Sequence, residues 1–377
     1  MKALFAGSFD PFTLGHLDIV KKTLKEYDEL IICISNNETK KHLFSQEDRK
    51  RIIEAALADL QTSKKITIVC NTGTTVDVAI KYNVDTLIRG IRSQSELDNE
   101  VSFATINEKL AQIRGFSIKT KLIWQEDFTL KSTSSSLVRA LFSLNEYIVC
   151  THYVPKNVHQ ELLCIYLKPY FKGLFAEAYI PRVETLWADL VKTYKSRPYH
   201  NLSHLGYMIN MFNIFQKQAS SNELASISSF NIILAIFMHD YVYDVTQNDN
   251  EERSIEETKK NWDGITFYQP KEVLRNLILA TKHTNVEPLT GEPGLVADLD
   301  LAILGTNHPQ TWDDYCNSIR QEYSIYSDKE YALARTEFLV KMLRRKQIFN
   351  TDCFFKLYEK QARKNIRKEI FKLRKYL

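Results

Sequence analysis

The stretch Gly7–His16, with the sequence GSFDPFTLGH, constrains the first part of the chain more than any other feature. It follows a short apolar run, Ala3–Ala6, that predicts a buried strand, and it precedes a segment with apolar residues at helical spacing. A strand, a Gly/Pro turn and a helix in this order predict a phosphate-binding corner, because a helix N-terminus offers unpaired N–H groups and the positive end of its dipole. We expect His16 to face a bound anion from the first helical turn and Ser8 to add a hydroxyl. On the last four residues alone, a histidine satisfied by its own turn is the simpler interpretation.

Short apolar runs alternate with segments of helical periodicity beyond this corner. The expected strands are Leu30–Ile34, Ile66–Cys70, Thr86–Ile88 and Ile118–Trp124. The expected helices are those from the Ser45 cap to about Leu60, over Val76–Tyr82, and from about Glu96 to Ile113. This alternation predicts an α/β domain with a Rossmann-like parallel sheet wrapped by helices. A ligand is expected beyond the carboxyl ends of the strands, where the sequence places Ser8, Lys40, Thr74, Thr75 and Arg89.

The full stretch GSFDPFTLGH resembles bacterial phosphopantetheine adenylyltransferases, and its T-x-G-H ending has the form found in nucleotidyltransferases related to class I tRNA synthetases. The resemblance extends over residues 1–160 and includes Thr39-Lys40-Lys41, Arg89-Gly90-Ile91-Arg92, Thr133–Arg139 and Val154–His159. It implies adenylyl transfer from ATP, used with Mg²⁺, to 4′-phosphopantetheine, giving dephospho-coenzyme A and pyrophosphate. It also implies a homo-oligomer formed through this domain.

The resemblance assigns a role to each motif residue. It makes His16, Lys40 and Arg89 catalytic. The implied ATP-binding residues are Ser8, Phe9, His16, Gly90, Arg92, Glu100, Ser134, Ser135 and Ser136. The implied substrate-binding residues are Ser8, Lys40, Thr75 and Arg89. These residue types suit the reaction, since adenylyl transfer needs positioning and charge neutralisation at phosphates and no covalent nucleophile. Taken singly, the serines would be a solvated helix cap and the arginines surface ion pairs.

Two positions depart from the family pattern. Thr74 and Thr75 stand where the family usually has two apolar residues along the pantetheine arm, and Asn99 stands where an aromatic residue often precedes the glutamate. Two hydroxyls would make the acceptor pocket more polar. An adenylyl- or cytidylyltransferase for another phosphorylated acceptor is therefore an alternative.

The pattern changes after this domain. Residues 161–180, with Pro169, Gly173 and Pro181 in or beside them, are interpreted as a junction. Residues 181–377 show helix after helix without alternating strands, which predicts a second, all-α domain.

The second domain carries a histidine and aspartate pattern of the order H…HD…D. Arg197–His204 reads RPYHNLSH, and the apolar run Ile232–Met238 ends in His239-Asp240. This pattern resembles the HD superfamily of metal-dependent phosphohydrolases, in a bacterial branch of predicted enzymes. The resemblance makes His204, His239, Asp240 and Asp300 metal ligands and His200 a proton donor to the leaving oxygen. Imidazole and carboxylate suit a divalent transition metal such as Mn, Fe, Ni or Zn.

Several assignments in this domain keep an alternative. Asp300 is preferred to Asp298 as the last ligand, although both would also serve as N-caps of a following helix. Asp244, Glu251 and Glu252 would hold a second metal, orient the first ligands, or simply form an acidic loop.

Composition adds the expected compartment and partners. No apolar run is long enough to span a bilayer, and six scattered cysteines without C-x-x-C spacing favour reduced thiols. The net charge of +4 is small. The basic segment from Arg363 to Leu377 is interpreted as a helix with a solvated basic face and a packed apolar face formed by Ile366, Ile370, Leu373 and Leu377. Nucleic-acid binding is therefore not expected. We therefore expect a cytoplasmic bifunctional fusion, with one domain serving only as a binding or regulatory module as the alternative.

Overall fold

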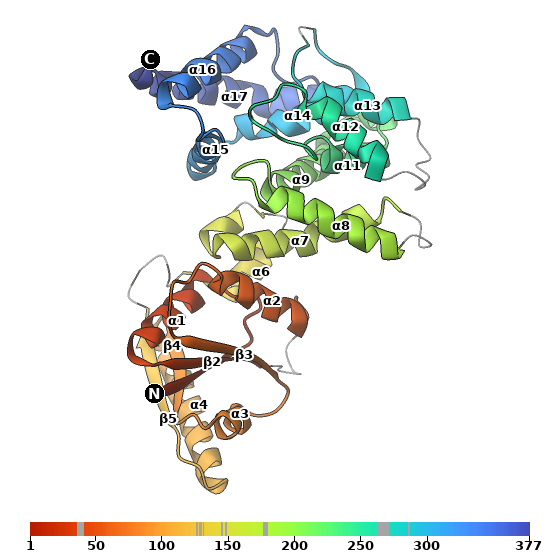
Figure 1. Cartoon of the computed structure of the whole chain (residues 1–377). Helices are drawn as coiled ribbons and strands as arrows, with labels where there is room; N and C mark the ends of the chain where they lie inside the picture. The colour runs from red at the N-terminus through yellow and green to blue at the C-terminus, as the bar shows by residue number, and fades with distance from the viewer. Residues whose placement is uncertain are drawn as a thin grey trace. The chain divides into compact units, whose positions relative to one another are not determined.

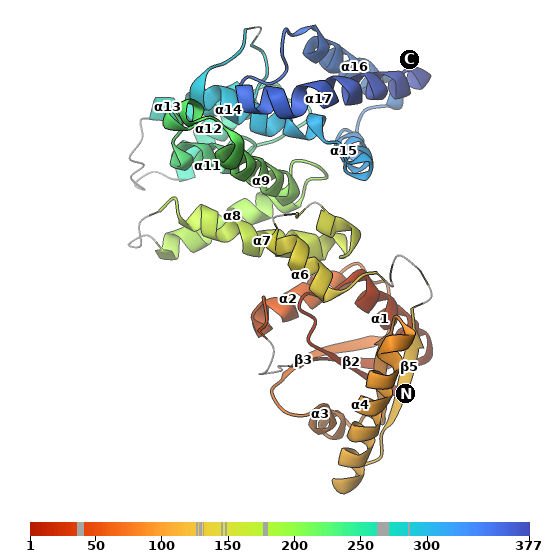
Figure 2. The same cartoon turned by 180° about the vertical axis from the view of Figure 1, so that it is seen from behind.

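The computed structural model describes residues 1–35, 41–125, 127, 130, 132–144, 146–147, 149–175, 180–261, 271–285 and 287–377. The chain divides into two compact units, Met1–Leu162 and Leu163–Leu377. Figures 1 and 2 show the elements of each unit from opposite sides. Lys40, predicted to be catalytic and to bind the substrate, lies outside the described residues.

The first unit is built on a five-stranded sheet with the strand order β3-β2-β1-β4-β5. Every neighbouring pair is parallel, which confirms the predicted α/β architecture. The strands are β1 (Lys2–Gly7), β2 (Glu29–Ser35), β3 (Lys65–Asn71), β4 (Thr86–Ile91) and β5 (Lys119–Trp124). The chain winds from β1 toward one edge and then returns to β4 on the other side of β1. The carboxyl ends of β1 and β4 therefore flank the topological switch point, where open α/β sheets bind ligands.

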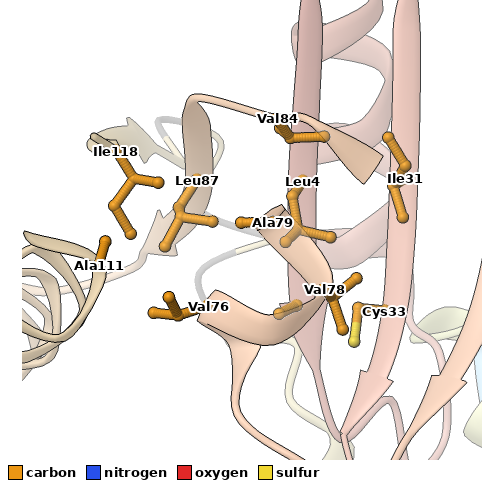
Figure 3. Packing of buried hydrophobic residues seen from close by; sticks show 11 residues of the cluster. Leu4, Ile31, Cys33, Val76, Val78, Ala79, Val84, Leu87, Ala111 and Ile118 are labelled. Atoms are coloured by element: carbon orange, nitrogen blue, oxygen red, sulfur yellow. The ribbon is translucent and has the colours of Figure 1, made fainter. Parts of the chain in front are cut away.

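Helices cover both faces of this sheet. They are α1 (Leu14–Glu26), α2 (Gln46–Leu57), α3 (Thr75–Tyr82), α4 (Gln94–Ile113) and α6 (Ser135–Ser143). In Figure 3 the buried face of the sheet, with Leu4 and Ile31, packs on Val76 and Val78 of α3 and on Ala111 of α4. Helix α1 lies on the opposite face from α3 and α4 (Figure 1).

The packing of α1 against β4 explains why residue 90 is a glycine. A Cβ atom at this position would overlap the side chain of Ile19 in α1. Glycine therefore lets α1 approach the strand closely, in addition to any role near ATP.

The second unit contains helices and no strand among its described residues. Its helices are the end of α7 (Lys156–Lys172), α8 (Ile180–Lys195), α9 (Leu202–Gln218), α10 (Ser221–Ala225), α11 (Ser229–Met238), α12 (Asn250–Asn261), α13 (Lys271–Ala280), α14 (Gly291–Leu301), α15 (Pro309–Glu322), α16 (Asp328–Arg344) and α17 (Asp352–Leu373). Helix α11 is the centre of the unit, because its residues 234–238 are at most 2% exposed and it packs against α9, α13 and α14. Its C-terminal end therefore delivers His239 and Asp240 to the interior.

Pro169 lies inside α7, which continues to Lys172 within the predicted junction. The alternative that Asp298 and Asp300 are N-caps of a following helix is excluded, because both lie near the end of α14.

The basic C-terminal segment is a helix that packs by one side. In α17, Ile366 and Leu373 are buried, whereas Leu377 beyond its end is exposed. Among the described residues, no helix combines the length and the apolar character needed to cross a bilayer.

Candidate functional sites

The predicted phosphate corner is held by side chains from distant parts of the first unit. Arg49 of α2 donates from Nη1 to the carbonyl oxygen of Ser8 (2.8 Å). The buried carboxylate of Asp10 accepts the backbone N–H groups of residues 43 and 44, both at 3.0 Å. Ser135, at the start of α6, donates its hydroxyl to a carbonyl within the stretch (2.8 Å). The loop between β1 and α1 is therefore fixed before any ligand binds.

His16 is oriented by the first turn of α1. Its Nδ1 accepts the backbone N–H of Thr13 (3.0 Å), while the Thr13 hydroxyl accepts the N–H of His16 (3.4 Å). Three phenylalanine rings surround the imidazole at centroid distances of 5.1–6.2 Å: Phe5, Phe9 and Phe12. Burial, with the charge of Arg92, lowers the pKa of His16 to about 3. The ring is therefore neutral near pH 7, and because Nδ1 is an acceptor, Nε2 carries the proton as a donor. The turn satisfies one nitrogen only.

A cavity of about 590 Å³ opens at the carboxyl ends of β1 and β4. Nearly all residues predicted for ATP and substrate line it: Ser8, Phe9, His16, Thr75, Arg89, Gly90, Arg92, Glu100, Ser134, Ser135 and Ser136. The structure thus brings together residues that are spread over more than a hundred positions in sequence.

The two arginines enter this cavity already paired with carboxylates of α4. Arg89 binds both oxygens of Glu100, at 2.5 and 2.9 Å, and donates to the carbonyl of Ala6 (3.0 Å). Arg92 binds Glu96 in the same way. The ion pairs considered as the simple alternative therefore exist, and they fix the guanidinium groups at the cavity wall. Glu100, predicted beside adenosine, is the partner of Arg89 in this state.

Thr74 and Thr75 have different surroundings. Thr74 is the N-cap of α3, where its hydroxyl accepts the N–H of Asp77 (3.2 Å) and donates to the Asp77 carboxylate (2.7 Å). Thr75 lines the cavity. Thr75 is therefore the residue through which the departure from the family pattern makes the cavity more polar. The Thr74 hydroxyl is already used in the N-cap of α3.

Sequence reasoning missed several residues of this cavity wall, among them Phe103, Asn107 and Gln125, and it gave no role to Arg139 of the Thr133–Arg139 motif. Phe103 and Asn107 follow Glu100 at the spacing of one helix face, so the periodicity of α4 could have identified them. Gln125 and Arg139 act on the corner itself. Gln125 donates to the carbonyl of Gly15 (2.6 Å), and Arg139 donates to that of Asp10 (2.5 Å). No local sequence pattern predicts these two long-range contacts.

In the second unit, four predicted side chains converge. His204 Nε2 lies 3.2 Å from both His239 Nε2 and Asp300 Oδ1, and His239 Nε2 lies 3.0 Å from Asp240 Oδ2. Two further pairs across the cluster are longer: His239 Nε2 lies 3.9 Å from Asp300 Oδ1, and His204 Nε2 lies 4.0 Å from Asp240 Oδ2. The residues come from the first turn of α9, the end of α11 and the last turn of α14.

Backbone contacts aim these ligating atoms. The Nδ1–H of His239 donates to the carbonyl of Ile236 (2.9 Å), which leaves Nε2 facing the cluster. Arg197 donates to the carbonyl of Asp240 (2.5 Å) and to that of Tyr241 (3.0 Å). The first residue of the RPYHNLSH motif therefore supports the turn that carries the HD pair.

His200 belongs to a second pair beside this cluster. Its Nδ1 lies 2.5 Å from Glu322 Oε2, its Nε2 lies 3.9 Å from Asp240 Oδ2, and its ring stacks on Tyr243. Burial lowers the pKa of His200, but the charges of Asp240 and Glu322 outweigh burial and raise it. His200 precedes α9 and is not on the same helical turn as His204. Glu322, at the end of α15, was missed because nothing near it in sequence links it to the motif.

Asp300 and Asp298 face different partners. Asp300 Oδ2 lies 2.8 Å from His283 Nε2, while its Oδ1 faces His204. Asp298 accepts four hydrogen bonds of 2.6–2.8 Å from the backbone and side chains of Asn350 and Thr351, at the start of α17. The geometry favours Asp300 as the candidate ligand and gives Asp298 a capping role.

The three acidic residues considered for a second metal also have different surroundings. Asp244 accepts the N–H and hydroxyl of Thr246 in its own turn, at 2.9 and 2.7 Å. Glu252 pairs with Lys282 (2.6 Å). Glu251 lines the cavity beside the cluster.

The side chains of His204, His239 and Asp240 form a group whose ligating atoms all lie within 4.8 Å of one another, and its imidazole and carboxylate donors fit a divalent transition metal. Asp300 Oδ1 lies 3.2 and 3.9 Å from the two histidines and is the candidate fourth ligand. The printed pairs, at 3.0–4.0 Å, are close to the roughly 3–3.5 Å between ligands bonded at about 2.1 Å. Burial lowers the pKa of His239, but Asp240 and Asp300 outweigh burial and raise it to about 9. Burial instead lowers the pKa of the neighbouring His204, so the pKa values of the two imidazoles shift in opposite directions beside Asp300.

Comparison with known proteins identifies relatives of the first unit. The family model described as cytidylyltransferase-like matches residues 4–141. Phosphopantetheine adenylyltransferase of Flavobacterium psychrophilum is 37% identical over 138 residues, which span 37% of this chain and 85% of the relative. That of Porphyromonas gingivalis is 41% identical over 141 residues, or 37% of this chain and 86% of the relative. That of Francisella tularensis is 31% identical over 166 residues, or 44% of this chain and 97% of the relative.

Proposed function

Because the chain belongs to the phosphopantetheine adenylyltransferase family through its first unit, we propose that this unit transfers the adenylyl group of MgATP to 4′-phosphopantetheine. A phosphate oxygen of the acceptor bonds to the α-phosphorus, the bond from that phosphorus to the bridging oxygen breaks, and pyrophosphate leaves. The products are dephospho-coenzyme A and pyrophosphate. The observation that carries the proposal is the cavity at the switch point, which contains His16, Arg89 and the serines at the start of α6.

Each group in this cavity has a task in the proposed reaction. The neutral His16 donates from Nε2 to an oxygen of the transferring phosphate, where charge develops in the transition state. The N-termini of α1 and α6 offer backbone N–H groups to the triphosphate. Arg89 and Arg92, which are paired with Glu100 and Glu96 on the cavity wall, would neutralise phosphate charge by releasing these half-buried partners. Lys40 would act at the acceptor phosphate. Thr75 keeps open the alternative of a different phosphorylated acceptor.

Pyrophosphate release tests this proposal. The full chain is incubated with MgATP and either 4′-phosphopantetheine or a panel of other phosphorylated acceptors, including nicotinamide mononucleotide and glycerol 3-phosphate. Rapid pyrophosphate release with phosphopantetheine alone supports the assignment. Release with a different acceptor only would replace the substrate and keep the reaction, and release with none would contradict both.

We further infer that the second unit is a metal-dependent phosphohydrolase of the HD type. The convergence of His204, His239, Asp240 and Asp300 supports this inference. A divalent ion held by these four residues would supply a Lewis acid for a phosphoryl oxygen. His200, oriented by Glu322, would give a proton to the leaving oxygen. The competing hypothesis makes this unit a regulatory module of the transferase.

Two aspartate variants provide a matched test. Asp300→Asn should lose the metal, measured by elemental analysis of the full chain, and should abolish hydrolysis of p-nitrophenyl phosphate. Asp298→Asn should keep the metal and lower the melting temperature, since this side chain accepts four hydrogen bonds away from the cluster. Chelation should also lower the melting temperature of wild type by linkage. Wild-type protein that binds no divalent ion would support the regulatory hypothesis.

A further inference from the structure

A cavity of about 600 Å³ adjoins the histidine–aspartate cluster within the second unit. Asp240, Asp300 and His200 line it together with residues of α15 and α16. Its volume lies in the range of sites that enclose a cofactor-sized or drug-sized molecule, far more than a phosphate alone requires. The organic part of a substrate therefore has room beside the proposed metal.

Aromatic rings dominate the wall of this cavity. Six tyrosines line it: Tyr199, Tyr243, Tyr315, Tyr323, Tyr326 and Tyr331. Several of their hydroxyls are bound to protein groups. The hydroxyls of Tyr243 and Tyr323 lie 3.1 Å apart, and that of Tyr326 donates to the carbonyl of Val245 (3.2 Å). Some ring faces are also covered, since Tyr243 stacks on His200 and Tyr323 stacks on Tyr326. The ring edges and the remaining faces are the aromatic surface of the cavity, and such surface suits a flat ring system.

The charges of the wall do not suit a chain of phosphates. The lysine and the arginine among its described lining residues are each bound to a carboxylate: Lys282 to Glu252 (2.6 Å) and Arg335 to Glu369 (2.8 Å). Glu251 and Glu330 add negative charge to the same wall. Within the described part of this cavity, a second or third phosphate would thus meet no uncommitted lysine or arginine. Placing such an anion there would be costly.

We propose that the second unit hydrolyses an ester with a single phosphate whose organic part is a flat ring system of nucleoside size, and that it discriminates against di- and triphosphates. The proposal rests on the phosphohydrolase function inferred above. In the reaction, a water oxygen bonds to phosphorus, the ester P–O bond breaks, and the alcohol oxygen takes up a proton. The products are a nucleoside-like alcohol and inorganic phosphate.

Phosphate release by the full chain with Mn²⁺ tests the specificity. The substrates are guanosine and cytidine 5′-monophosphates, the corresponding triphosphates, glycerol 3-phosphate, and p-nitrophenyl phosphate as a general probe. Because base–aromatic stacking is worth about tenfold or more in affinity, kcat/KM should be at least about tenfold higher for the nucleoside monophosphates than for glycerol 3-phosphate. The triphosphates should be equally poor.

A pair of neighbouring variants locates the specificity in the cavity. Both Leu333 and Ala334 are exposed on α16, but only Ala334 lines the cavity. Ala334→Trp should fill the cavity and lower the ratio of nucleoside monophosphate to glycerol 3-phosphate turnover, and Leu333→Trp should leave the ratio unchanged. Calorimetry with uncharged guanosine adds a readout without catalysis: Ala334→Trp should bind it more weakly than Leu333→Trp does.

The possible outcomes distinguish the proposed substrate specificity from the phosphohydrolase activity itself. Hydrolysis of glycerol 3-phosphate or of triphosphates as fast as of nucleoside monophosphates would overturn the specificity and keep the phosphohydrolase. Absence of hydrolysis of every ester, p-nitrophenyl phosphate included, would overturn the phosphohydrolase, and with it the substrate assignment. Equal guanosine binding by the two tryptophan variants would exclude the cavity as the aromatic site.

Discussion

Replacing His16 by alanine should lower the turnover of adenylyl transfer at least as strongly as it weakens ATP binding. The structure defines what is lost: Nδ1 is occupied by the N–H of Thr13 (3.0 Å), so only the Nε2–H donor acts on the transferring phosphate. Removing one preorganised donor from a transition-state charge costs about 3 kcal/mol, or about a hundredfold in kcat. Substrate in the ground state carries less charge at that oxygen, so the ATP dissociation constant should change less.

Alanine also removes the acceptor that closes the cap of α1, which should cost about 1 kcal/mol of stability. His16→Asn supplies an acceptor oxygen at the same helical position and separates the two effects. It should melt closer to wild type than His16→Ala and should still turn over slowly. The assay is pyrophosphate release at saturating ATP and phosphopantetheine, with ATP binding measured by calorimetry. A kcat equal to wild type in His16→Ala would refute the assigned role.

Three further predictions concern pH, the acceptor and the second unit. Burial lowers the pKa of His159 from 6.5 to about 4, so between these values the unfolded chain takes up a proton that the folded chain does not. Stability should therefore fall with falling pH by up to about 1.4 kcal/mol per unit from this group, and His159→Gln should flatten that dependence in melting curves recorded from pH 7 to 4.5. Thr75→Leu should maintain or lower the KM for phosphopantetheine, whereas Thr74→Leu should leave KM alone and cost about 1 kcal/mol of stability by removing the α3 cap; loss of activity in Thr75→Leu would indicate a more polar acceptor. Glu322→Ala should reduce hydrolytic kcat by about a hundredfold with the metal retained, and Glu322→Gln should recover part of it because an amide still orients His200; equal losses in both variants would argue against an orienting role.

The sheet could be predicted because each strand corresponds to a short apolar run that is recognisable in the local sequence. The apolar run Ile66–Cys70 is short and bounded by polar residues, and the observed strand β3 extends it by one residue at each end. Strand β4 instead continues through Arg89 to Ile91, beyond the predicted end at Ile88. There the pairing with β5 extends the strand across residues whose side chains serve the cavity.

The parts of the sites that escaped prediction depend on contacts between distant segments. Glu322 reaches His200 across 122 positions, and Gln125 reaches Gly15 across 110. No periodicity or motif in either segment contains this information, because tertiary packing alone decides which loop end meets which helix start. The motif residues were found because short patterns such as RPYHNLSH and His239-Asp240 carry a family resemblance, and no such pattern contains their supporting residues.

Asp298 and Asp300 show why one of two neighbouring carboxylates is the candidate ligand. Both lie in α14, and two positions along a helix correspond to a rotation of about 200°, so the side chains point to opposite sides. Asp298 is directed to neutral donors at the start of α17, and burial there raises its pKa to about 7 despite four hydrogen bonds. Burial acts in the same direction on Asp300, but His204 and His283 outweigh it and hold its pKa well below the usual value. Asp300 therefore keeps its negative charge facing the imidazoles, and α14 separates a structural carboxylate from one that can hold a cation.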